Sequence, residues 1–293
     1  MKAGFVALVG RPNVGKSTLL NYLIGQKISI TSRRPQTTRH RIHGIKTTEQ
    51  GQAVYVDTPG IHASERRAMN RYLNRTAGTA LLDVDLIVWL IDRPAWQTED
   101  DLVLELIKSA GVPVILAINK IDWLEDKAAL LPFLESAESR HDFAAMIPIS
   151  ALKGANLDVL ESKIMDLLPE GEPIFPEDQI TDRSERFLAA EIIREKLLRS
   201  LGQEVPHALT VEIEQFKVEG LLTRISAVIW VERPGQKAIV IGRKGEVLKK
   251  VGERARHDVE RLLDGKVFLQ LWVKVKEGWS DDDRALRSLG YSE

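Results

Sequence analysis

Five short apolar runs limit the folds open to residues 1–170 more than any other feature of this chain. They lie at residues 5–9, 53–56, 86–91, 114–118 and 146–149. None alternates apolar with polar residues, which is typical of strands buried on both faces of a parallel sheet. Stretches with helical spacing separate the runs, at residues 17–23, 69–82, 100–109 and 157–168. We therefore predict βαβ crossovers and a doubly wound α/β sheet, whose ligands bind at the carboxyl ends of the strands.

The composition supports two domains and excludes several classes of protein. The chain has 293 residues, of which 44% are hydrophobic and 28% charged, enough to bury a sizeable core. It contains no cysteine, which excludes disulfides, thiolate catalysis and cysteine-ligated metal centres and suits a reducing cytosol. The first apolar run ends at Gly10, too early for a signal peptide, and the run at 86–91 is too short to span a membrane. We expect a soluble, cytoplasmic protein.

The second half of the chain has a different organisation. Prolines alternate with acidic residues at 170–182, where we predict a semi-rigid acidic linker. Beyond it we expect a helix at 186–201, strands at 209–216, 223–232 and 238–241, a helix at 246–263 and a last strand at 267–276. The α-β-β-α-α-β order that we assign to this half indicates a small α+β domain. The net charge of the chain is −1, yet residues 237–256 carry seven basic and two acidic side chains, a local charge of +5 that favours phosphate contact.

Residues 10–17 match the pattern G-x-x-x-x-G-K-S, directly after the first predicted strand and at the start of a helix. In this context the glycines let backbone N–H groups face phosphate oxygens, and the helix N-terminus adds positive potential. We expect Lys16 to reach the β- and γ-phosphates and Ser17 to bind Mg²⁺. The predicted phosphate-binding residues are Gly10, Asn13, Gly15, Lys16, Ser17, Thr18 and Gly60.

The end of the run at 114–118 indicates which base is bound. It leads into Asn-Lys-Ile-Asp at 119–122, and the Asp122 carboxylate can accept from both the N1–H and the exocyclic amine of guanine. Adenine cannot present these two donors together, which argues against a kinase or an ATPase. Asn119 would brace this loop, the Lys120 stem would cover the ring, and a backbone N–H after the last strand would reach the guanine oxygen. The predicted guanine-binding residues are Asn119, Lys120, Asp122, Ser150, Ala151 and Leu152.

Two further segments complete a predicted Mg²⁺ site with Ser17. The sequence Asp57-Thr-Pro-Gly60 ends the run at 53–56, which positions Asp57 to hold a water of Mg²⁺ and the Gly60 N–H to sense the γ-phosphate. A polar loop at 33–39 offers a threonine hydroxyl to the metal. We favour Thr38 over Thr37 as this ligand.

These guanine-nucleotide motifs, in this order, make the first half similar to Ras-like GTPases of the translation-factor type. The stretches at 187–196 and 231–242, followed by Gly-x-x-Gly, resemble the Era family of bacterial ribosome-assembly GTPases, and the similarity runs nearly end to end. The resemblance implies an Era-type GTPase domain at 1–169, the linker at 170–182 and a type II KH RNA-binding domain at 183–293.

The same resemblance implies a function and partners. It implies GTP binding and hydrolysis coupled to binding of the 3′ end of 16S rRNA, with a role in 16S rRNA processing and assembly of the small (30S) ribosomal subunit. The implied partners are that RNA end and the 30S subunit or its precursor. The resemblance also suggests a monomer in the cytoplasm and leaves open a weak peripheral association with the inner membrane.

Gly242-Arg-Lys-Gly245 follows the expected strand at 238–241 and precedes a helix. Two glycines allow a phosphodiester backbone to lie close to such a turn, and the basic pair and helix N-terminus neutralise it, as KH domains do when they clamp about four nucleotides. The bases would lie beside residues 238–241. The predicted RNA-binding residues are Lys237, Ile241, Gly242, Arg243, Lys244, Gly245, Lys249 and Lys250. We interpret Trp272, on the last predicted strand, as a core residue rather than a platform for base stacking.

Hydrolysis by the protein alone should be slow. Ile61 stands directly after Gly60, where Ras-like switches carry a glutamine that orients water. We hypothesise that Asn13 and backbone carbonyls of the loop at 31–38 hold a K⁺ ion that stabilises transition-state charge. The predicted cofactors are therefore GTP or GDP, Mg²⁺ and, as a hypothesis, K⁺.

Two functional classes fit the sequence. The first is a GTP-hydrolysing, RNA-binding switch for small-subunit assembly. The second is a membrane-peripheral or cell-cycle signalling GTPase whose KH domain docks a protein.

Overall fold

The computed structural model describes residues 1–32, 34, 36–61, 67–126, 128, 130–201, 205 and 209–291. Contacts divide the chain into two compact units. The first comprises Met1–Ser29, Thr38–Glu65 and Asn70–Asp182, and the second comprises Ile30–Thr37, Arg66–Met69 and Arg183–Glu293.

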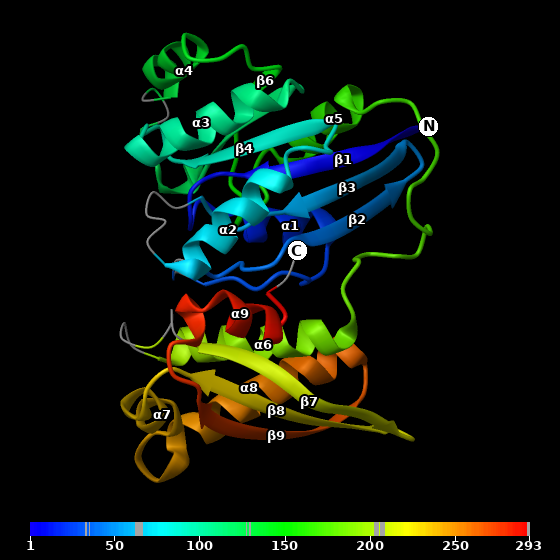
Figure 1. Ribbon diagram of the computed structural model, residues 1–293. Helices are drawn as coiled ribbons and strands as arrows, with labels where there is room; N and C mark the ends of the chain where they lie inside the picture. Colours follow the sequence, from blue (N-terminus) through cyan, green and yellow to red (C-terminus); the bar gives the residue numbers. More distant parts are fainter. Residues whose placement is uncertain are drawn as a thin grey trace. The chain divides into compact units, whose positions relative to one another are not determined.

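A six-stranded sheet with the order β2-β3-β1-β4-β5-β6 forms the first unit (Figure 1). The parallel strands are β1 (Lys2–Val9), β3 (Gly51–Asp57), β4 (Leu86–Asp92), β5 (Val114–Asn119) and β6 (Ala145–Pro148). At one edge, β2 (Ile42–Thr48) pairs antiparallel with β3. Every residue of β3 and β5 is buried, as are most of β1 and β4, which confirms the prediction of strands covered on both faces.

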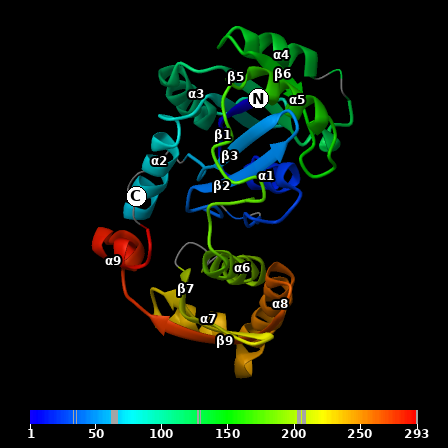
Figure 2. The ribbon, with the colours of Figure 1, turned by 90° about the vertical axis from the view of Figure 1, so that its right-hand side faces the viewer.

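Helices cover both faces of this sheet, as Figure 2 shows. Alternate strand residues such as Val9, Trp89 and Ile91 pack in one core with side chains of three helices, α2 (Ala68–Thr79), α3 (Thr98–Ala110) and α4 (Leu130–Glu138). The helices α1 (Lys16–Ile24) and α5 (Leu157–Leu167) cover the opposite face. The fold is the doubly wound α/β sheet that the sequence predicts.

Two elements of the first unit were not expected from the sequence. β2 is an edge strand in which Ile42 and Ile45 are buried while His43 and Lys46 are partly exposed, so it contains no continuous apolar run. In α4, Leu130 and Ala137 are buried and Phe133 and Leu134 pack partly buried against the same core, so the helical spacing is present in the sequence and the prediction missed it.

Residues 170–182 belong to the first unit by their contacts and form neither a helix nor a regular strand. The amide of Gln52, fully buried on β3, accepts from the N–H groups of Ile174 and Phe175 at 2.7 and 2.9 Å and donates to the Phe175 carbonyl at 2.9 Å. Isolated bridges also join Lys2 to Glu170 and Gly44 to Thr181. The acidic, proline-rich segment is therefore held against the sheet.

The second unit packs helices on one face of a three-stranded sheet with the order β7-β8-β9. Its elements are α6 (Glu185–Ser200), β7 (Leu209–Glu219), β8 (Leu222–Val231), α7 (Pro234–Ile241), α8 (Glu246–Leu263) and β9 (Lys266–Val275), followed by a short α9 (Asp283–Ser288). β8 pairs antiparallel with β7 and parallel with β9. The observed order is α-β-β-α-α-β, the order assigned from the sequence, although a strand and not a helix was expected at 238–241.

Two expectations for this unit are wrong. Residues 238–241 are the end of helix α7 and not a strand, because Pro234 begins the helix and Gln236 accepts from the N–H groups of Glu232 and Arg233 at 2.9 and 3.0 Å. An apolar run of four residues cannot by itself distinguish the two structures. Trp272 is 56% exposed rather than in the core, because the opposite phase of β9, including Val267 and Val273, faces the helices.

Candidate functional site

Two glycines shape the loop between β1 and α1. Gly10 and Gly15 have φ of 141° and 111°. A Cβ at Gly10 would lie 2.3 Å from the carbonyl oxygen of Leu90, and one at Gly15 would lie 2.2 Å from Nδ2 of Asn119. Only glycine fits these positions, so the loop packs closely against the ends of β4 and β5. Asn13, at the exposed tip of the loop, is also left-handed, with φ of 65°.

Lys16 begins helix α1 with its side chain folded back over the loop, and Thr18 follows it in the first helical turn. The Nζ atom of Lys16 donates to the carbonyl oxygens of Gly10 and Arg11 at 2.8 and 2.9 Å. Burial lowers the pKa of Lys16 to about 8, although the charge of Asp57 opposes this shift. The ammonium is thus poised beside the loop with partners that anionic oxygens could replace.

Ser17, Thr38 and Asp57 meet at the ends of α1 and β3. The Ser17 hydroxyl donates to Oδ2 of Asp57 at 2.8 Å and lies 2.8 Å from Oγ1 of Thr38. Ser29, which sequence reasoning missed, also donates to Oδ2 at 2.8 Å. Oδ1 of Asp57 is buried and has no hydrogen-bond partner among the described residues. Burial raises the pKa of this carboxyl, against the hydrogen bond from Ser17 and the charge of Lys16.

Thr37 and Thr38, which lie between α1 and β2, differ in their surroundings. Thr37 Oγ1 lies 2.7 Å from the Ser32 hydroxyl and donates to the Arg34 carbonyl at 2.5 Å. Thr38, by contrast, is buried beside Ser17. Of the two, Thr38 is the threonine whose hydroxyl lies next to Ser17. Arg33 and Pro35 of the same loop lie outside the described residues.

Gly60 and Ile61 follow β3 and approach the phosphate loop. A Cβ on Gly60 would lie 2.7 Å from the backbone nitrogen of Pro12. Ile61 is 5% exposed and packs in the apolar core with Val9 and Ile87, so its side chain does not face solvent.

The loop after β5 brings the predicted base-binding residues together. Asn119 donates to the Val14 carbonyl at 2.8 Å and accepts from the Ala151 N–H at 2.9 Å, which ties three segments together. The Ser150 hydroxyl donates to Oδ1 of Asp122 at 2.6 Å. Lys120 is in the left-handed region, with φ of 65°, and its Nζ donates to the Asn13 carbonyl at 2.8 Å. Leu152, at the end of this group, is 69% exposed.

The predicted RNA-binding residues of the second unit lie around the turn between α7 and α8. Gly242 and Gly245 have φ of 74° and 81°, and Lys244 between them is also left-handed. A Cβ on Gly242 would lie 2.4 Å from a methyl group of Val247, whereas the space beside Gly245 is open. The exposed basic residues of this surface are Arg243, Lys244, Lys249 and Lys250, while Lys237 and Ile241 of α7 are partly buried.

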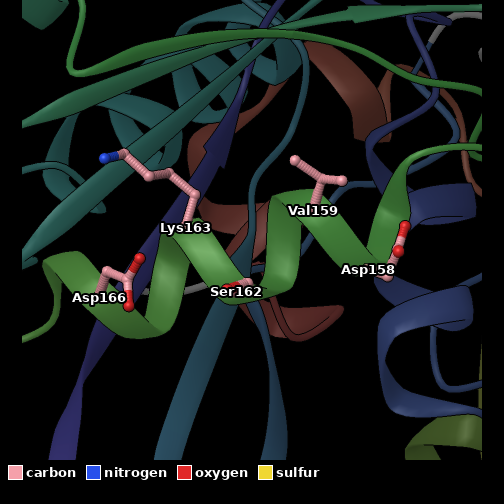
Figure 3. Close-up of a pocket in the computed structure, with 5 residues that line it drawn as sticks. All are labelled: Asp158, Val159, Ser162, Lys163 and Asp166. Carbon is pink, nitrogen blue, oxygen red and sulfur yellow. The ribbon is translucent and has the colours of Figure 1, made fainter.

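A separate shallow pocket lies on α5 (Figure 3). It is lined by Asp158, Val159, Ser162, Lys163 and Asp166, all from this one helix, and none belongs to the predicted sites. The described part of the chain contains no cluster of three metal-ligating His, Asp or Glu side chains. No helix within the described ranges is long and apolar enough to cross a membrane.

Comparison with known proteins identifies the class of both units. A family model described as 50S ribosome-binding GTPase matches residues 5–120, and a KH domain model matches residues 204–280. The chain is 59% identical to GTPase Era of Pseudomonas aeruginosa and 58% identical to GTPase Era of Marinobacter nauticus, in alignments that cover 100% of this chain and 96% of each relative.

Two solved Era structures are also similar, each with a TM-score of 0.97 and 42% identity over 100% of both chains. One is a variant of Era from Aquifex aeolicus bound to GDP and AlF4⁻. The other is Era in complex with MgGDPNP and nucleotides 1506–1542 of 16S ribosomal RNA.

The doubly wound sheet with its phosphate loop, followed by the KH fold, defines an RNA-binding P-loop GTPase. At 59% identity to GTPase Era over its whole length, the chain belongs to the Era family. Its activity is GTP hydrolysis.

Proposed function

We propose that the first unit binds GTP with Mg²⁺ at the carboxyl ends of β1, β3 and β5 and hydrolyses it there. The observation that carries this proposal is the buried Oδ1 of Asp57, which lacks a partner among the described residues, beside the hydroxyls of Ser17 and Thr38. Such oxygen donors suit a hard cation. The similar Era structures contain MgGDPNP in one case and GDP with AlF4⁻ in the other, which supports the same ligands here.

Each of the grouped side chains has a role in this proposal. Lys16 exchanges the carbonyls of Gly10 and Arg11 for β- and γ-phosphate oxygens. Ser17 and Thr38 bind the metal directly, and Asp57 holds one of its waters. Bound Mg²⁺ neutralises charge on the phosphates.

The remaining residues of this site recognise the base and the γ-phosphate. Asp122 accepts from the N1–H and exocyclic amine of guanine, and Ser150 orients its carboxylate. Lys120 covers the ring, and Asn119 holds the loop in place. The backbone N–H of Gly60 contacts the γ-phosphate, which is the contact that GDP cannot make.

A monovalent cation completes the proposed hydrolytic site. Because Ile61 is buried in the core, it cannot orient the attacking water. We assign charge stabilisation to a K⁺ ion that the Asn13 side chain would help to hold, in the role that an arginine finger has in other GTPases.

We propose further that the turn between α7 and α8 clamps the 3′ end of 16S rRNA. The two left-handed glycines and the exposed Arg243 and Lys244 support phosphate contact, and about four nucleotides fit such a clamp. The similar Era structure with nucleotides 1506–1542 of 16S rRNA supports the choice of RNA. The bases then lie beside helix α7, not beside a strand.

From these ligands we infer a role in 16S rRNA processing and 30S subunit assembly. The protein would act in the cytoplasm as a monomer on the 30S subunit or its precursor, with a weak peripheral association with the inner membrane as an additional location.

Sequencing the RNA that crosslinks to the GTP-bound protein tests this function. Enrichment of the 3′ end of 16S rRNA, lost in a Gly242→Asp, Gly245→Asp variant that still binds GTP, is the expected result. A protein partner captured by the second unit without any enriched RNA would instead favour a signalling GTPase whose KH domain docks a protein.

A further inference from the structure

A largely buried charge network lies beside the nucleotide site, and of its side chains only Lys120 has a role in the proposed contacts to GTP. Its centre is Arg11, a phosphate-loop residue that is only 8% exposed. Its guanidinium donates through Nη2 to Oδ1 of Asp92, through Nη1 to Oε1 of Gln97 and through Nε to Oδ1 of Asp100, all at 2.8 Å. Three bonds from one planar group fix the orientation of the loop.

Asp92, the last residue of β4, extends the network to the base-binding loop. Its Oδ1 accepts from Arg11, while its Oδ2 lies 3.3 Å from Nζ of Lys120. The same Nζ donates to the Asn13 carbonyl of the phosphate loop at 2.8 Å. One carboxylate therefore bonds a residue of the phosphate loop and a residue of the base loop at once.

The two carboxylates of the network, Asp92 and Asp100, both have cationic partners. Arg11 pairs with both of them, and Lys120 and the more exposed Arg93 lie 3.3 and 3.8 Å from Oδ2 of Asp92. Oδ2 of Asp100 accepts from the Gln97 N–H at 3.0 Å, which fixes both partners at the start of α3. Because buried charges gain from pairing only when their geometry is fixed, this arrangement suits orientation rather than plain stability.

We propose that Asp92 and Arg11 are positioning residues that add to the bond between Asn119 and Val14 in holding the phosphate loop and the base loop together. This proposal rests on the proposed nucleotide site. If the loops move together, contacts to the phosphates and contacts to guanine depend on each other, and a nucleotide must break both to leave. Removing the negative charge of Asp92 should then quicken nucleotide release and weaken discrimination between bases.

Asp92→Asn tests this idea, because asparagine keeps the shape and removes the charge. The matched control is Asp101→Asn, an exposed carboxylate on α3 that bonds Trp96 and not the network. For each protein we would measure the GDP dissociation rate, the affinities for GDP and inosine diphosphate, and the unfolding temperature without nucleotide. Inosine diphosphate lacks the exocyclic amine that would donate a hydrogen bond to Asp122. The ratio of the GDP affinity to the inosine diphosphate affinity therefore measures the contact between Asp122 and the base.

We expect Asp92→Asn to raise the dissociation rate about tenfold, the effect of losing one charge-assisted hydrogen bond. We also expect the preference for GDP over inosine diphosphate to fall several-fold, while Asp101→Asn changes neither quantity. If Asp92→Asn keeps the wild-type preference for GDP over inosine diphosphate, the network only stabilises the fold, even if the variant unfolds at a lower temperature and releases GDP faster. If Asp92→Asn does not fold, Arg11→Lys, which keeps the charge but cannot make three planar bonds, gives the same comparison.

The wild-type affinities for GDP and inosine diphosphate test the proposed guanine site separately from the positioning role of Asp92 and Arg11. Equal affinities for GDP and inosine diphosphate in the wild type would overturn the guanine site itself, and the positioning role with it. A wild type that prefers GDP, beside an Asp92→Asn variant that keeps both rate and preference, would overturn the positioning role alone.

Discussion

Nucleotide binding should take up protons at mildly alkaline pH because Lys16 is buried. Burial lowers the pKa of Lys16 from 10.5 to about 8, against the opposing charge of Asp57 and with a further contribution from Arg11. In the free protein its ammonium donates to the carbonyl oxygens of Gly10 and Arg11. Phosphate oxygens favour the charged form, so the pKa of Lys16 rises when a nucleotide binds. Above pH 8, the nucleotide and a proton must therefore bind together.

The size of the effect follows from this pKa. With a pKa of about 8, Lys16 is about nine-tenths protonated at pH 7 and about one-quarter protonated at pH 8.5. If the bound lysine is fully protonated, GDP binding takes up about 0.1 proton at pH 7 and about 0.75 proton at pH 8.5. The affinity falls about fourfold over the same interval, or about 0.8 kcal/mol.

Calorimetric titration with GDP in two buffers of different ionisation enthalpy measures this proton count. Mg²⁺ is left out, because burial raises the pKa of Asp57 and metal binding would add its ionisation to the count. The remaining binding of a Lys16→Arg variant should show no uptake, since arginine does not titrate in this range. Uptake below about 0.2 proton at pH 8.5 in the wild type, or an equal count in the variant, would refute the reasoning.

Three other predictions concern the base, the hydrolytic step and the RNA. Asp122→Asn should lose at least about tenfold in GTP affinity and gain xanthosine triphosphate binding, because the amide reverses the donor pattern; unchanged GTP titrations would remove Asp122 from the site. Turnover should be faster in K⁺ than in Na⁺ at equal ionic strength, and Asn13→Ala should abolish the difference; equal rates in both salts would exclude the cation. Gly242→Asp with Gly245→Asp should abolish RNA binding but not GTP binding, whereas Gly78→Asp on α2, where an added Cβ meets open space, should leave both intact.

The sequence predicts the parts of the site that are local in the chain. Gly10 and Gly15 could be placed because a glycine pattern between a strand and a helix has one established geometry. Asp122 could be assigned because its loop follows a buried strand, whose carboxyl end is where ligands bind. Long-range partners were not predictable. Arg11 and Asp100 are 89 residues apart, and nothing in either segment indicates that the two side chains meet.

The two errors in the second unit have different causes, one local and one long-range. Residues 238–241 are apolar in either structure, and the proline at the start of α7 was the signal that distinguished helix from strand. Trp272 alternates with apolar neighbours, but alternation alone does not say which face of the sheet the helices cover. Core packing decided that question.

Nucleotide state and RNA binding should be coupled. Thr38 lies beside Ser17, where a γ-phosphate and Mg²⁺ would order it. The residue before it, Thr37, belongs to the second unit by its contacts, and its carbonyl accepts from Arg194 of α6. A change at Thr38 therefore has a direct covalent path to the unit that carries the turn at Gly242.

The RNA affinity measured with GDP and with a non-hydrolysable GTP analogue tests this coupling most directly. We predict that the GTP form binds the 3′ end of 16S rRNA about 5- to 150-fold more tightly, the range of a typical coupling free energy of about 1 to 3 kcal/mol. By reciprocity, that RNA should favour the GTP analogue over GDP by the same factor. Identical RNA affinities in the two nucleotide states would contradict the switch and leave a GTPase and a KH domain that merely share one chain.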